Sequence, residues 1–140
     1  MEQSQIFGPM LVLMMLTVLV WFYMYSKRIP FIRSLNIDPK ELTPMYLATQ
    51  APPSVSTSSD NLKNLFEVPV LFYTLTLYLY VTGQVDSTYV TAAWVYVIFR
   101  AVHSAVHCTV NIVMLRFVLY AISSLVFFFM LGRAVAGYFF

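Results

Sequence analysis

Four apolar stretches divide the chain, and each is close in length to a helix that crosses a bilayer. They cover residues 7–25, about 65–81, about 89–110 and about 115–138. A helix needs about 20 apolar residues to cross the hydrocarbon core, and it satisfies all its backbone groups within one segment. The pattern therefore predicts an all-α membrane protein in which four transmembrane helices form an antiparallel bundle.

The polar connections between the stretches predict the orientation of the bundle. Residues 26–63 hold five of the eight basic residues and five of the seven prolines, so we expect a surface loop with a short helical piece around 39–46. The short connection at 82–88 has no basic residue. Because Lys and Arg are retained on the inner side, the long loop is predicted to be cytoplasmic and both termini to lie outside the cytoplasm.

Composition agrees with lipid as the main solvent of the chain. The sequence is 60% hydrophobic and only 10% charged, whereas a soluble domain carries about 25% charged residues. With 140 residues, we expect a single membrane domain over residues 1–140. The net charge is only +2 and the basic residues are scattered, so no nucleic-acid partner is expected.

The third stretch carries a polar stripe. Its members are Tyr96, Arg100, His103, His107 and Asn111. Their spacings of four, three, four and four residues place them on one face of a helix. An arginine near the middle of a span costs about 2.5–3.5 kcal/mol on insertion scales, so Arg100 should be paired or functional. One subunit offers little interior for such a stripe, so we expect other subunits to cover it in a homo-oligomer.

The predicted topology gathers polar residues from three stretches at the cytoplasmic end. The second stretch begins there with Asn64 and Glu67, the third ends there, and the fourth begins there with Arg116. Glu67 is the only carboxylate inside a span, so an ion pair between Glu67 and Arg100, made directly or through one water, is predicted. The alternative is that this pair and a few hydrogen bonds only hold the bundle together.

The two histidines of the stripe have the spacing of a metal-binding pair. However, His103 and His107 lack a nearby third ligand of the HExxH kind, so no metal is expected. A histidine such as His103, taken alone, would more often be a packing residue. The single cysteine, Cys108, cannot form an internal disulfide.

Three short motifs in this region resemble a known family. Residues 64–69, Asn-Leu-Phe-Glu-Val-Pro, resemble the NxxExP signature in the second helix of the MAPEG family, the membrane-associated proteins in eicosanoid and glutathione metabolism. Arg100 and His103 resemble the RxxH element of its third helix, and Arg116 resembles the arginine that opens its fourth helix. The resemblance covers about residues 58–120. It is closest to the bacterial branch of the family, which implies the bacterial inner membrane as the location.

The resemblance implies a homotrimer of four-helix subunits that uses glutathione as a co-substrate. The tripeptide would lie between neighbouring subunits, with Arg116 stabilising its thiolate. A cation beside a thiol favours the thiolate, which is the nucleophile. The further residues implied at the glutathione site are Asn64, Glu67, Arg100, His103 and His107.

Two positions differ from the family pattern and leave two functions open. Asp60 stands where glutathione-binding members carry an arginine, and His107 stands where they carry a tyrosine. The protein is either a glutathione transferase or peroxidase acting on lipophilic electrophiles, or a non-catalytic membrane subunit or lipid-binding bundle within a larger membrane complex. An enzyme would need a loop cation to replace the missing arginine; the candidates are Lys27, Arg28 and Arg33.

Overall fold

The computed structural model describes residues 2–140, which form helices and no strand. Four segments are long and apolar enough to cross a membrane: Gln3–Ser34, Pro53–Val81, Ser87–Cys108 and Val113–Phe139. The prediction of an all-α, multi-pass integral membrane protein is therefore confirmed.

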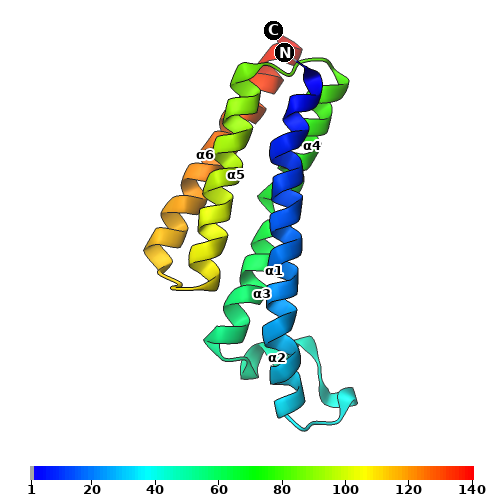
Figure 1. The fold of residues 1–140 in the computed structure, drawn as a ribbon, viewed down its shortest axis with the longest axis vertical. Coiled ribbons are helices and arrows are strands. Elements are labelled where there is room, and N and C mark those ends of the chain that lie inside the picture. The colour runs from blue at the N-terminus through cyan, green and yellow to red at the C-terminus, as the bar shows by residue number, and fades with distance from the viewer. Residues whose placement is uncertain (1) are drawn as a thin grey trace.

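Successive spans run in alternating directions along the long axis of the molecule (Figure 1). The helices are η1 (Gln3–Ile6), α1 (Phe7–Ser34), η2 (Pro39–Glu41), α2 (Pro44–Gln50), α3 (Pro53–Leu65), α4 (Val68–Val81), α5 (Ser87–Cys108) and α6 (Val113–Phe139). Both termini lie at one end of the bundle, which we call the terminal end. The α5–α6 turn and the connection from α1 to α3 lie toward the other end, which we call the basic end.

The connection at 26–63 is far more helical than the sequence predicted. Helix α1 continues to Ser34 and α3 begins at Pro53, so only the stretch between them contains irregular backbone. The difference comes from the prolines. Pro39, Pro44 and Pro53 each lie in the first turn of a helix, where a missing N–H costs no hydrogen bond. Three of the five prolines that indicated a loop in the sequence therefore begin helices in the structure, while Pro30 lies inside α1.

The second span is broken between α3 and α4. Phe66 and Glu67 leave the helical conformation, with φ −104° and ψ 9° at Phe66 and φ −93° and ψ −107° at Glu67. Pro69 in the first turn of α4 has no N–H to donate back to α3, so the helical hydrogen bonding cannot continue through this point. The sequence placed Asn64 and Glu67 at the start of the span, but Asn64 lies just before a break inside it and Glu67 lies within that break.

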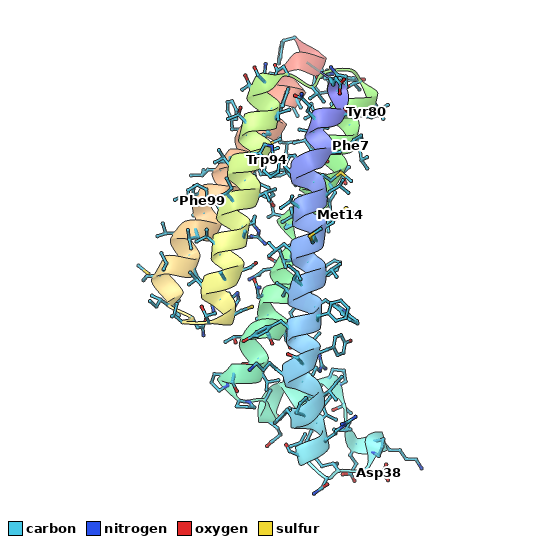
Figure 2. The ribbon with its side chains drawn as sticks, viewed as in Figure 1. Phe7, Met14, Asp38, Tyr80, Trp94 and Phe99 are labelled. Carbon is cyan, nitrogen blue, oxygen red and sulfur yellow. The ribbon has the colours of Figure 1, made fainter. Side chains whose placement is uncertain are left out.

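An apolar core fills the space between the spans. Its fully buried members include Leu13, Phe72, Leu79, Phe127 and Met130. Near the terminal end, the ring of Phe7 in α1 lies 4.5 Å from that of Tyr80 in α4 (Figure 2). Buried apolar area of this kind holds the helices together by close packing, which inside a bilayer replaces the hydrophobic effect as the main attraction.

The four members of the polar stripe that lie in α5 are buried within a single subunit, whereas Asn111 lies past the end of α5 and is half-buried. Tyr96 and Arg100 are 0% exposed, and His103 and His107 are 2% exposed. Helices α1, α3 and α6 all pack against α5, and the ring of Phe72 in α4 stacks on Tyr96 at 4.5 Å. The expectation that other subunits must cover the stripe is therefore wrong, because the chain's own helices surround it.

Polar contacts close the terminal end. Gln3 donates to the carbonyl of Val85 at 3.1 Å and accepts from its N–H at 2.9 Å. Asp86 caps α5 by accepting from the N–H of Tyr89 at 3.0 Å, and it also accepts from Nη1 of Arg133 in α6 at 2.8 Å. The Arg133 hydrogen bond lowers the pKa of Asp86 from 3.8 to about 2. These contacts tie the N-terminus, the α4–α5 turn and α6 together.

Candidate functional site

Five of the six residues that the sequence predicted for the site come together toward the basic end. The guanidinium Nη2 of Arg100 donates to the carbonyl of Asn64 at 2.6 Å. Nδ1 of His103 lies 3.0 Å from the carbonyl of Arg116, and because a carbonyl oxygen can only accept, this nitrogen carries the proton. The rings of His103 and His107 are 5.6 Å apart. Contacts across three helices therefore build one cluster.

The prediction of a direct ion pair between Arg100 and Glu67 is wrong. Glu67 is exposed, and the ion pairs among residues 2–140 involve other side chains. The reason is the break in the second span. It frees the Asn64 carbonyl at the end of α3, where the helix dipole is negative and attracts a cation. Arg100 occupies this position, while Glu67 lies at the N-cap of α4 with its side chain at the surface.

Several buried polar atoms around Arg100 have no hydrogen-bond partner in the described part of the chain. They are Nε and Nη1 of Arg100, the hydroxyls of Tyr73 and Tyr96, Nε2 of His103 and Nδ1 of His107. The guanidinium also lies 5.2 Å from the centre of the Tyr120 ring, an attractive cation–π contact. Buried polar groups are normally paired with protein or with ordered water. The cluster thus has donors and acceptors to spare for a polar molecule.

Glu67 and Arg116 are the two charges of the site that reach the surface of the subunit. Glu67 lies six residues past Asn61, and Asn61 contacts Cys108 at the end of α5. Glu67 is therefore an exposed carboxylate well inside a span, which is costly in lipid. Arg116 is partly buried, and its guanidinium donates to Oδ1 of Asn111. Neither charge has an ionic partner within residues 2–140.

A cavity of about 300 Å³ lies between α1, α2 and α3 and reaches Asp60 and Lys63 near the end of α3. Its polar lining comes from Arg28, Ser56, Ser59, Asp60 and Lys63. Asp60 accepts from the Lys63 ammonium at 3.2 Å, so these two charges compensate each other. Of the loop cations that the sequence offered as a replacement for the family's arginine, Arg28 is in the lining of this cavity.

The structure also adds site residues that the sequence analysis missed. Ser104 donates to Oδ1 of Asn61 at 3.2 Å, and Nδ2 of Asn61 donates to Sγ of Cys108 at 3.3 Å. Both Asn61 and Ser104 are buried. Periodicity could have found them, since Ser104 follows Arg100 by four residues and Asn61 precedes Asn64 by three, which places each on the same helical face as a predicted site residue.

Among residues 2–140, no group of three His, Cys, Asp or Glu side chains is placed to hold a metal ion. The groups that the site presents are guanidinium cations, a carboxylate, two imidazoles and amide oxygens, which suit a charged or polar organic molecule.

Comparison with known proteins gives the family of the chain. The model of the MAPEG family matches residues 6–136. Curated proteins and solved structures give no significant match. The matched range contains every site residue described above and nearly all of the four spanning segments. The chain therefore belongs to the MAPEG family.

Proposed function

We propose that the protein is a glutathione-dependent enzyme, a transferase or peroxidase that acts on lipophilic electrophiles reaching it from the bilayer. One observation carries the proposal. Glu67 and Arg116, which have opposite charges, both reach the surface of a membrane span without an ionic partner in residues 2–140. Glutathione carries an ammonium, two carboxylates and a thiol, so it offers a counterpart to each of these charges.

Each charged group of glutathione has a matching residue. The carboxylate of Glu67 accepts from the ammonium, and such a charge-assisted hydrogen bond is about twice as strong as a neutral one. The glutathione carboxylates are attracted by Arg28, whose charge is not cancelled by the pair between Asp60 and Lys63 in the same cavity. Arg28 thereby replaces the arginine that the family pattern has at position 60.

Arg116 acts on the thiol. A guanidinium beside the sulfur stabilises the thiolate, which is the nucleophilic form. In the transferase reaction the thiolate attacks an electrophilic carbon and forms a C–S bond, and the thiol proton passes to the product or the leaving group. Arg116 is partly buried, and a positioned charge acts more strongly in such a site than in bulk water.

A second copy of the chain completes the site. An exposed carboxylate inside a span should not face lipid, so we expect a neighbouring subunit to cover Glu67 and glutathione to lie between subunits of a homotrimer. The detergent-corrected mass of the purified protein, measured by light scattering, tests this. A mass equal to one or two subunits would contradict the trimer.

A second candidate function rests on Asp60. This residue stands at the position of the family's arginine and forms an ion pair with Lys63, which removes one cation from the cavity. That arrangement favours a non-catalytic membrane subunit, which packs against a larger complex and binds no glutathione. The two functions differ in whether the free protein binds the tripeptide.

Isothermal titration of glutathione into the detergent-solubilised protein decides between them. We expect the parent protein to bind glutathione and the Glu67→Gln variant to bind it about tenfold or more weakly, because a hydrogen bond to a charged group is lost. Glu41→Gln, an exposed carboxylate in η2, is the matched control and should bind as the parent does. A parent protein that binds no glutathione at millimolar concentration would support the non-catalytic subunit.

A further inference from the structure

The guanidinium of Arg116 is hydrogen-bonded to a neutral side chain, that of Asn111, whose backbone has an unusual conformation. Asn111, in the α5–α6 turn, has φ +50°, and its Oδ1 accepts from Nη1 of Arg116. Positive φ is uncommon for residues other than glycine, and asparagine is among the few that adopt it readily. The N–H of Asn111 donates to the carbonyl of Val106 at 2.8 Å, which ties the turn to α5.

The backbone of Arg116 is held as well. Nδ1 of His103 donates to the Arg116 carbonyl at 3.0 Å, and His103 is itself buried in the bundle. The guanidinium and the backbone of Arg116 are thus contacted from two places, the turn and α5. Contacts of this kind fix the position of a side chain that must meet a substrate with little tolerance.

We propose that Asn111 is the positioning residue of this site, which aims the Arg116 guanidinium while leaving its positive charge free for an anionic sulfur. The inference rests on the glutathione site proposed above. An amide oxygen orients a guanidinium through a hydrogen bond but carries no net charge. A carboxylate at the same place would orient it equally well and would cancel its charge.

Two substitutions separate orientation from charge. Asn111→Asp keeps the size of the side chain, the acceptor oxygen and a tolerance for positive φ, but adds a negative charge next to Arg116. Asn111→Gly keeps the turn, since glycine adopts positive φ freely, but removes the acceptor. Asn36→Asp is the matched control, because Asn36 has nearly the same backbone conformation, φ +48°, and is exposed in the connection after α1.

Two glutathione analogues report on charge at the sulfur position. Glutathione sulfonate carries a permanent negative charge there, and S-methylglutathione carries none. We expect Asn111→Asp to weaken binding of glutathione sulfonate about tenfold or more and to leave the affinity for S-methylglutathione within about twofold of the parent. Asn111→Gly should weaken binding of glutathione sulfonate by a smaller factor, about threefold, because the charge of Arg116 remains but its guanidinium is less well oriented. Asn36→Asp should change neither affinity.

The same titrations can overturn the inference. A parent-like affinity of the Asn111→Asp variant for glutathione sulfonate would show that the neutral acceptor does not matter. Equal losses for both analogues, together with a lower unfolding temperature, would show that Asn111 only holds the turn. A parent protein that binds neither analogue would remove the proposed function and this inference with it, whereas binding by the parent with no effect of Asn111→Asp removes the inference alone.

Discussion

The two ends of the bundle differ in the hydrogen-bond partners of their arginines. At the terminal end, Arg133 of α6 donates to both carboxylate oxygens of Asp86, with Nη1 2.8 Å from Oδ1. Toward the basic end, Arg100 and Arg116 each donate to an oxygen of an asparagine, a backbone carbonyl in one case and a side-chain amide in the other. At the terminal end, the charge of an arginine is compensated by a carboxylate. Toward the basic end, the charges of two arginines have no compensating carboxylate among residues 2–140.

This difference separates a stabilising contact from a functional one. The pair between Asp86 and Arg133 joins α5 to α6, and its two charges compensate each other. The opposite end keeps two buried or partly buried cations and an exposed carboxylate inside the membrane region, which costs stability. Groups whose charge is maintained at such a cost are candidates for ligand binding, since perturbed and unpaired charges gather at functional sites.

The largest expected effect comes from removing the charge of Arg116. Arg116→Ala should lower kcat/KM by about 10²–10³-fold, the usual effect of losing one stabilising donor of a reactive anion, and should abolish the ultraviolet absorbance of bound thiolate at neutral pH. Arg116→Lys should restore part of both, because lysine supplies charge without the guanidinium fork. Arg133→Ala, the matched change at the paired end, should leave the thiolate intact. An Arg116→Ala variant that ionises glutathione normally would remove the distinction between the two ends.

A smaller effect is expected from Arg100, whose role in the structure is to cap the broken end of α3. Arg100→Leu should lower the free energy of unfolding by about 1.5–3 kcal/mol, the value of a hydrogen bond from a charged group, and Arg100→Lys should recover much of it. Glu67→Gln should cause no loss of stability, because its carboxylate is not paired with Arg100. Denaturant unfolding in detergent measures all three. Equal losses for Arg100→Leu and Glu67→Gln would instead support the ion pair that the sequence suggested.

The ion pair between Asp86 and Arg133 should contribute even less to the free energy of unfolding. Its side chains are 38% and 42% exposed, and such pairs contribute about 0.2–1 kcal/mol, so Asp86→Asn should be only slightly less stable than the parent at neutral pH. Because pairing lowers the pKa of Asp86 to about 2 from 3.8, its contribution is present above 3.8 and is lost as pH falls toward 2. Unfolding temperatures of parent and variant should therefore converge over that interval. A constant difference down to the lowest pH would argue against the pair.

The last prediction tests which end faces the cytoplasm and should leave stability unchanged. In a Cys108→Ser background, a cysteine at the exposed Ser54 should react only with a reagent that crosses the membrane, and one at the exposed Thr88 should react with an impermeant reagent in intact cells. Both residues lie outside the site. The reverse labelling pattern would place the unpaired charges on the outer side and would invert the predicted orientation.

Much of the site could be located from sequence because helical periodicity is a local property. Spacings of three and four residues placed Arg100, His103 and His107 on one face, and the structure buries all three together. Periodicity does not show which part of the protein a helix face packs against. It therefore gave no sign that the face is buried within a single subunit, or that Asn111 contacts Arg116 across a turn in a left-handed conformation.

The sequence alone determined the four spans, the all-helical class and the family, because span length, polarity and short motifs are written in contiguous residues. Only the tertiary structure decided the partner of Arg100. A proline two residues past Glu67 breaks the second span, and this break both frees a carbonyl for the guanidinium and turns the carboxylate outward. Whether two opposite charges meet depends on the path of the backbone between them, and that path follows from packing and hydrogen bonding across helices.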